Sequence, residues 1–292
     1  MLGMREIRRR IRSVNSIQQI TRAMEMVAVS RLKRAEERLR SARPYAEKIQ
    51  ELMESLAPSL PQIEHPLVAK RDPLRIAVVL ITSDKGLCGA FNANIIHTAC
   101  RFIEERSDKE IKLFLVGKKG HDFFSRRGYS IEYYLPQVSR DISPQEVKEI
   151  SNSFIHGFET GLHDAVYLFY TQFRTAMNTR PTQTKLLPIE SPEAESQRGT
   201  GEPIYEPSAE EIMNELFPRY IEAQVYKGLV ESSASEHGAR MISMKNATDN
   251  AEEMIKTLTL SYNKARQASI TKEIIEVTTA SEALKYARKS GL

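Results

Sequence analysis

The stretch Ile7 to Leu56, IRRRIRSVNSIQQITRAMEMVAVSRLKRAEERLRSARPYAEKIQELMESL, decides the fold. Alternating steps of three and four residues along it select one side of a helix, and most of the selected positions are apolar. The selected positions are Ile7, Ile11, Val14, Gln18, Thr21, Glu25, Ala28, Leu32, Ala35, Leu39, Ala42, Ala46, Ile49, Met53 and Leu56. The pattern predicts one helix over residues 1–57, which at about 1.5 Å per residue would be roughly 85 Å long.

Polar residues interrupt this apolar side at three consecutive positions, namely Gln18, Thr21 and Glu25. Apolar side chains stand beside them in the sequence, at Ile17, Ile20, Met24 and Val27. We therefore expect the apolar side to drift by one residue around the helix in this region and then to continue.

A second long helix is predicted at the other end of the chain, over residues 208–286. Its apolar side is marked by Met244, Ala247, Ala251, Ile255, Leu258, Tyr262 and Ala265. Pro218 stands where such a helix could begin, and from there to Ala283 it would be near 100 Å long. Because each helix has one apolar side to cover, we expect the two to form an intramolecular antiparallel coiled coil.

The middle of the chain, residues 73–189, alternates strand and helix patterns. The expected strands are 74–82, 111–116, 129–135, 166–173 and 184–189, and the expected helices are 92–105, 118–127 and 143–160. Ser143 is the expected N-cap of the last of these helices, because Pro144 follows it. The alternation predicts a Rossmann-like α/β domain. Residues 190–207, rich in Ser, Gly, Pro and Glu, are expected to form a mobile linker, and residues 287–292 a basic tail.

Charge is concentrated at the start of the chain. Residues 1–43 carry 12 Lys and Arg against 4 acidic residues, a balance of +8, whereas the whole chain carries only +4. A basic helix suits nucleic acid, a membrane surface or an acidic protein partner, and it can also be an ordinary solvated face. An import peptide is disfavoured because Glu6 interrupts the basic run and the apolar side continues far beyond any cleavage point.

Motifs for catalysis or cofactor binding are weak. The turn around Gly86 and Gly89 has a lysine and a helix start, but its spacing matches neither the dinucleotide fingerprint nor the Walker motif, and 117–120 fails in the same way. The six histidines show no metal-ligand spacing. Cys88 and Cys100 are too few for a disulfide scaffold, and Cys88 reads as a small buried side chain. We expect no catalytic residue, no cofactor and no metal site, and no run of apolar residues is long enough to span a membrane.

Several long strings nevertheless resemble one family, the gamma subunits of F-type ATP synthases. These strings are Arg5 to Arg8, Ile17 to Ala28, Thr82 to Gly89, Ala234 to Glu236, Met244 to Ala251 and Tyr262 to Glu273. They occur in order over essentially the whole chain. One departure is the segment after Glu276, where the family usually has a Gly-Ala pair and this chain continues with Val277 to Leu284 and a basic tail to Leu292.

The resemblance implies a non-catalytic rotor shaft that couples ion flow through a membrane ring to ATP synthesis or hydrolysis. It implies as partners the alpha and beta subunits of the catalytic ring, the epsilon subunit and the membrane c-subunit ring, with no nucleic acid and no direct membrane insertion. It places the chain at the cytoplasmic face of the bacterial plasma membrane, as a peripheral component. The residues that it sets against the alpha and beta subunits are Arg8, Arg9, Met24, Lys245, Arg266, Gln267 and Thr271.

Simpler roles compete for these residues: Met24 can be plain core of the coiled coil, and the arginines a solvated face. Two other classes of protein also remain open. A basic coiled-coil protein that binds nucleic acid would use the +8 segment on phosphates, with an affinity that falls steeply as salt rises. A nucleotide-dependent enzyme would need the turn between Ser83 and Asn92.

Overall fold

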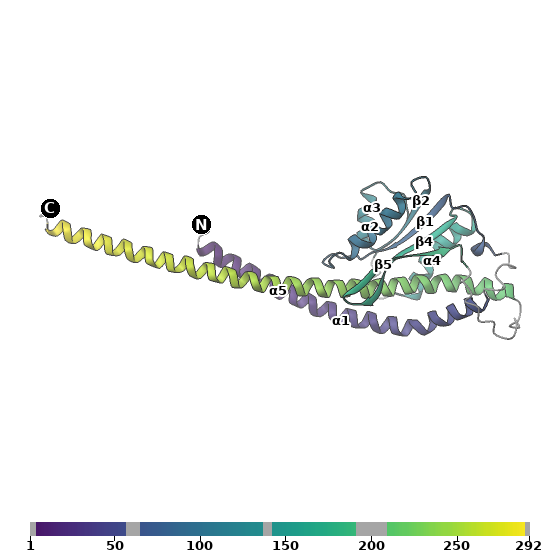
Figure 1. Ribbon diagram of the computed structural model, residues 1–292, viewed down its shortest axis with the longest axis horizontal. Coiled ribbons are helices and arrows are strands. Elements are labelled where there is room, and N and C mark those ends of the chain that lie inside the picture. The colour runs from purple at the N-terminus through teal and green to yellow at the C-terminus, as the bar shows by residue number, and fades with distance from the viewer. Residues whose placement is uncertain (1–3, 57–64, 137–141, 191–208, 290–292) are drawn as a thin grey trace. The chain divides into compact units, whose positions relative to one another are not determined.

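The computed structural model describes residues 4–56, 65–136, 142–190 and 209–289. Its elements, labelled in Figure 1, are α1 (Met4–Leu56), η2 (Pro66–Val68), β1 (Arg75–Ile81), α2 (Phe91–Glu104), β2 (Glu110–Val116), α3 (Lys118–Ser125), β3 (Ile131–Leu135), α4 (Pro144–Glu159), β4 (Ala165–Thr175), β5 (Asn178–Leu187) and α5 (Ala209–Lys289). The predicted fold class is confirmed: a mixed α/β chain with a mostly parallel sheet between two long terminal helices. The predicted linker, apart from Glu190, and the end of the predicted tail lie outside the described residues.

The chain divides into two compact units. Unit 1 consists of residues 1–26 and 244–292, and unit 2 of residues 27–243. Each unit therefore contains a segment of α1 and a segment of α5, and these segments run in opposite directions (Figure 1).

In unit 1 the two helices meet along the sides that the sequence predicts. On α1, Ile7 is buried and Ile11 and Val14 are half-buried. On α5, all seven predicted positions are buried or half-buried, and among them Met244 and Ala251 are buried most deeply. Apolar burial of this kind is the main term that holds paired helices together.

The predicted drift of the apolar side is wrong. Gln18, Thr21 and Glu25 are half-buried, so the side keeps its original spacing through the polar positions. By contrast, Ile17, Ile20 and Val27 are 50%, 59% and 52% exposed, and Met24 alone of the four is half-buried. The physical reason is that Thr21 has a partner: the Thr248 hydroxyl of α5 donates a hydrogen bond of 2.9 Å to the Thr21 hydroxyl oxygen.

In unit 2 five strands form one sheet in the order β3-β2-β1-β4-β5. β1 pairs in parallel with β2 and with β4, β2 pairs in parallel with β3, and β5 pairs antiparallel with β4. β1 is buried at every position after Arg75, which explains why its sequence is a continuous β-branched and apolar run. The strand order is that of the Rossmann-like domain predicted from the sequence.

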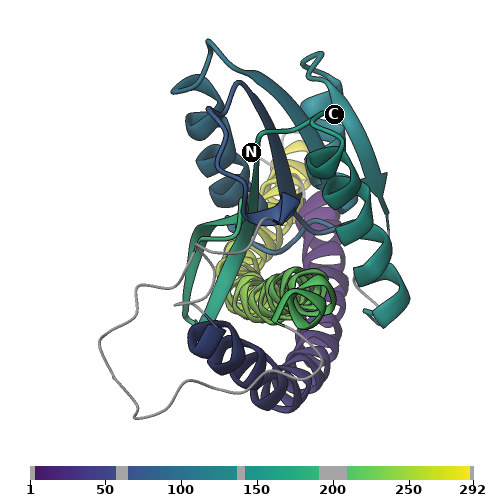
Figure 2. The ribbon, with the colours of Figure 1, turned by 90° about the vertical axis from the view of Figure 1, so that its right-hand side faces the viewer.

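Helices cover both faces of this sheet (Figure 2). On one face α2 and α3 pack against Ile76, Val78 and Leu80 of β1. On the other face α4 and the first part of α5 pack against Ala77 and Val79, the alternate positions of the same strand. The period of two along a strand thus sends one set of side chains to each layer.

The second half of α1 also joins the core of unit 2. Ile49 and Met53 belong to the cluster that α4 and α5 form with the sheet, and Leu32 and Ala35 are buried against Ala234 of α5. The two helices therefore pack against each other in this unit as well.

Pro218 does not begin α5, contrary to the prediction, because the helix already starts at Ala209. A proline inside a helix costs a backbone hydrogen bond and crowds the preceding turn. Met213, Phe217 and Ile221 on both sides of it are completely buried in the core of unit 2. This burial holds the helix through the proline.

The predicted cap of α4 is confirmed. The Ser143 hydroxyl accepts a hydrogen bond of 3.1 Å from the Glu146 amide, and the Glu146 carboxylate accepts one of 2.8 Å from the Ser143 amide. The two groups form a capping box, which satisfies backbone donors that a helix start leaves free.

We predict that Ser143→Ala lowers the free energy of unfolding by about 1 kcal/mol, because the N-terminal amides of α4 lose their acceptor. Ser153→Ala is the matched control, since the Ser153 hydroxyl donates to Ile150 O within the same helix and caps no helix end. Urea unfolding followed by circular dichroism measures both variants. Equal losses of stability in the two would contradict the capping role.

Candidate functional site at the carboxyl ends of the sheet strands

Buried polar side chains of α5 bind the backbone of β4. The Thr171 amide donates to the Ser232 hydroxyl at 3.1 Å, and the Ser235 hydroxyl donates to the Thr171 carbonyl, also at 3.1 Å. The Phe173 amide donates to a carboxylate oxygen of Glu231 at 3.3 Å. Because Ser232, Ser235 and Glu231 are all buried, these bonds are made away from water, where an unpaired partner is costly.

Two glycines let α5 come this close to the sheet. A Cβ placed on Gly228 would lie 3.0 Å from Leu168 Cδ2 of β4. A Cβ on Gly238 would lie 3.2 Å from the backbone of Ala176, at the turn between β4 and β5. Glycine weakens an isolated helix, but at these two positions its lack of a side chain permits close packing.

The loop after β1 is closed by its own polar groups. Asn92, in the first turn of α2, accepts from the Ser83 amide at 2.9 Å and donates to the Ser83 hydroxyl at 2.7 Å. The Ser83 hydroxyl in turn donates to the Lys85 carbonyl at 2.7 Å. At the tip, Leu87 has a left-handed backbone with φ of 62° and a side chain that is 61% exposed. A non-glycine residue keeps that conformation when its surroundings enforce it.

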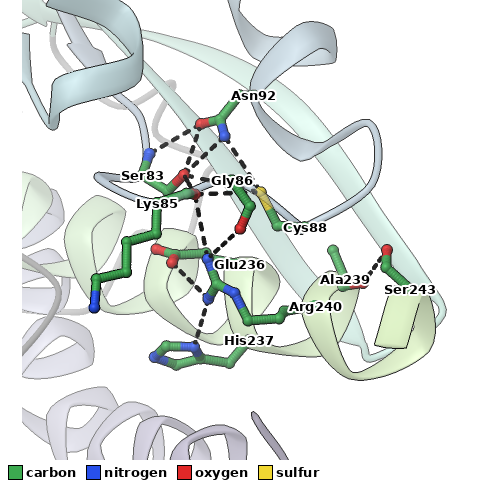
Figure 3. Close-up of polar contacts among 10 residues, drawn as sticks. All are labelled: Ser83, Lys85, Gly86, Cys88, Asn92, Glu236, His237, Ala239, Arg240 and Ser243. Atoms are coloured by element: carbon green, nitrogen blue, oxygen red, sulfur yellow. Dashed lines mark hydrogen bonds and ion pairs between the residues drawn. The ribbon is translucent and has the colours of Figure 1, made fainter. Parts of the chain in front are cut away.

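Arg240 of α5 holds this loop from below (Figure 3). Its Nη2 donates to the carbonyls of Lys85 and Gly86 at 3.3 and 3.2 Å, and its Nη1 lies 2.7 Å from Glu236 Oε1 and 3.2 Å from His237 Nδ1. We call these contacts the Arg240 clasp. The Arg240 and Glu236 side chains are only 10% and 7% exposed, so the clasp is a buried ion pair that also satisfies two loop carbonyls.

Burial sets the protonation of the groups in and beside the clasp. It raises the pKa of the Glu236 carboxyl, and the adjacent Arg240 guanidinium opposes that rise. It lowers the pKa of His237 to about 4, with the positive charges of Arg240 and Arg31 acting in the same direction. His237 is therefore neutral near pH 7 and can accept the Arg240 N–H. Burial also raises the pKa of the Cys88 thiol, which disfavours a reactive thiolate.

The start of α3 does not offer free amides to a phosphate. The amides of Lys118, Lys119 and Gly120 donate at 2.9 to 3.0 Å to oxygen atoms of residues 82–84. In Rossmann-like domains ligands bind beyond the carboxyl ends of the strands, where the strand order reverses. Here α5 and the Arg240 clasp lie against those ends. The arrangement therefore supports attachment of the sheet to α5.

The predicted contact residues do not belong to this site. Arg8, Arg9, Met24, Lys245, Arg266, Gln267 and Thr271 all lie in unit 1, on α1 and α5, and all except the half-buried Met24 are exposed. No sequence motif singles out Arg240 or the pairing of α5 with the loop after β1. The sequence feature that could have indicated the clasp is the spacing of Glu236 and Arg240, which allows an i,i+4 ion pair on a helix.

Within the described ranges, no group of three or more His, Cys, Asp or Glu side chains is arranged to hold a metal ion. The same part of the chain contains no helix whose length and hydropathy would let it cross a bilayer.

The model of the ATP synthase family matches residues 3–284. The ATP synthase gamma chain of Pelotomaculum thermopropionicum is 45% identical over 285 residues, which cover 98% of this chain and all of that protein. The gamma chain of Heliobacterium modesticaldum is 46% identical over 291 residues, covering 97% of this chain and all of that protein. The chain belongs to the ATP synthase gamma chain family.

Two solved ATP synthase structures each contain a chain with a similar fold. A chain of the central stalk and c-ring of the Tetrahymena thermophila mitochondrial ATP synthase is 28% identical, with a TM-score of 0.61 over 78% of this chain and 99% of that chain. A chain of the Euglena gracilis mitochondrial ATP synthase is 17% identical, with a TM-score of 0.69 over 99% of this chain and 97% of that chain. Because its identity is only 17%, the second match shows a shared fold and nothing further.

The lowered pKa of His237 predicts a pH-dependent stability. In the unfolded chain His237 binds a proton near pH 6.5, whereas in the folded chain it does so only near pH 4, so folding loses free energy as the pH falls through this window. We predict that His237→Asn, which keeps an acceptor near Nδ1 but does not titrate, is less sensitive to pH between 6.5 and 4. The difference between the two curves should reach on the order of 3 kcal/mol.

Urea unfolding at a series of pH values measures this difference. Parallel curves for the variant and the unsubstituted chain across the window would contradict the buried, neutral state of His237.

Proposed function

We propose that this chain is the central rotor shaft of an F-type ATP synthase, which couples ion flow through the membrane ring to ATP synthesis or hydrolysis by rotation. The observation that carries the proposal is the pairing of α1 with α5 in both units, together with the buried attachment of the sheet to α5. The similar Tetrahymena chain comes from a structure of a central stalk with its c-ring. No step of this function needs chemistry in the chain itself.

The last part of α5 exposes apolar side chains that a partner could cover. Residues 270–283 are all exposed, and four of them are large and apolar: Ile270, Ile274, Ile275 and Val277. A contiguous apolar surface on a helix is typical of a contact with a partner. We assign this contact to the interior of the ring of alpha and beta subunits.

Basic and polar residues of unit 1 complete that contact in the proposal. They are Arg8 and Arg9 on α1, Lys245, Arg266, Gln267 and Thr271 on α5, and the half-buried Met24. The exposed cations among them can meet acidic groups of the beta subunits, which gives the association orientation as well as affinity. In the same proposal, the sheet domain binds the epsilon subunit and the c-ring. The bacterial relatives support a place at the cytoplasmic face of the plasma membrane.

The energetics favour a stiff element. One charge that crosses a potential of 100 mV releases about 2.3 kcal/mol, whereas moving a two-state subunit from 1:99 to 99:1 requires about 5.5 kcal/mol. Several charges must therefore act on one catalytic step. A helix pair that turns as one body can pool them, and the buried attachment of the sheet to α5 lets a torque on the sheet domain reach that helix.

Purification of the tagged chain from its native cells tests the proposal. We expect the other soluble ATP synthase subunits to purify with it, and ATP hydrolysis by that complex to be lost when this chain is withdrawn. Purification of the chain with nucleic acid instead, with an affinity that falls steeply as salt rises, would support the competing class of basic coiled-coil protein.

We predict that Met24→Lys weakens the coupling between ATP hydrolysis and ion pumping, because it adds a charge at a half-buried position where α1 would meet the ring. Hydrolysis itself should remain largely intact. Met24→Leu, which keeps an apolar side chain of similar size, is the control and should pump normally. Inverted membrane vesicles report the pumping per ATP hydrolysed, and an unchanged ratio in Met24→Lys would count against this contact.

A further inference from the structure

Thr21 of α1 and Thr248 of α5 meet inside the apolar contact of unit 1. Both residues are half-buried, and the Thr248 hydroxyl donates to the Thr21 hydroxyl at 2.9 Å. The Thr21 hydroxyl in turn donates to the Gln18 carbonyl one turn earlier on α1, at 3.0 Å. The Thr248 hydroxyl also lies 2.9 Å from the Met244 carbonyl oxygen one turn earlier on α5, so its one proton has an acceptor on each helix.

The aliphatic contact beside the hydroxyl pair specifies the axial position of the two helices less strictly than the hydroxyl pair does. Beside the polar positions, α1 presents Ile11 and Val14 and α5 presents Ile255 and Leu258, all aliphatic and half-buried. Aliphatic side chains at alternating spacings of three and four can interlock at more than one axial offset. Coiled coils also absorb an offset of three or four residues by a local change of winding.

The hydroxyl pair distinguishes these offsets. In an antiparallel pair each step forward on α1 is one step back on α5, so Thr21 opposite Thr248 places Gln18 opposite Ala251. A shift of four residues would instead bring Gln18 opposite Ile255 and Thr21 opposite Glu252, which separates the two hydroxyls. A polar group at one core position of a coiled coil is known to specify register at a cost in stability.

We propose that the hydrogen bond between Thr21 and Thr248 fixes the axial register of α1 and α5 in unit 1. The two threonines act as positioning residues, and the proposal holds for the full chain whether or not it turns in a complex. It accounts for the threonine at position 21 of the apolar side, where Ile20 was available one residue away.

Disulfide formation measures the register in the full chain. Gln18→Cys is combined either with Ala251→Cys, the pair that the register brings together, or with Ile255→Cys, the pair of the shifted offset. Each pair is made with native threonines, in the Thr21→Val/Thr248→Val background and in a Thr257→Val control. The Thr257 hydroxyl donates within α5, to Glu253 O. Peptide mapping separates the engineered bond from the native Cys88 and Cys100.

With native threonines and with Thr257→Val, we expect the 18–251 bond to form much faster than the 18–255 bond. In the double valine background, which keeps the shape and the apolar packing, that ratio of rates should fall severalfold while the helix content by circular dichroism stays the same. An unchanged ratio would overturn the proposal. So would a fall of the same size in a Thr21→Ser/Thr248→Ser background, since serine keeps the hydroxyl and loses the methyl group.

Discussion

The structure depends on the packing of α1 against α5 along one side of each helix. Neither helix is apolar all round, and helices of this length gain most of their stability from a covered apolar side. In unit 1 the covered sides meet around Thr21 and Thr248, and in unit 2 they meet around Ala35 and Ala234. The sheet domain is inserted between the two helices in the sequence.

The second constraint is the polar attachment of the sheet to α5. A buried ion pair is seldom a large net source of stability, but breaking one is strongly destabilising, and its geometry is specific. The Arg240 clasp and the hydrogen bonds to Thr171 fasten a loop and a strand to a single helix. In the proposed rotor this attachment transmits torque. It also occupies the place where open α/β sheets of this topology bind ligands.

Periodicity in the sequence predicted both terminal helices and the order of strands and helices in the middle, because buried sides repeat with the geometry of each element. It failed where tertiary contacts determine which side of a helix is buried or where a helix begins. The apolar side of α1 does not drift to Ile17 and Ile20, because a hydroxyl on α5 satisfies Thr21. Pro218 lies inside a helix because core packing outweighs its local cost. The Arg240 clasp joins residues about 155 positions apart. Periodicity in one sequence describes local structure, so it does not predict a contact between such distant residues.

The central claim is that α1 and α5 act as one body, and a covalent link between them tests it most directly. Ala35 and Ala234 are buried in one cluster of unit 2, so cysteines at these positions should form a disulfide in the assembled complex. The account predicts that the oxidised complex hydrolyses ATP and pumps ions as well as the reduced one. Failure of the bond to form in the native assembly, or loss of coupled pumping on oxidation that reduction restores, would contradict it.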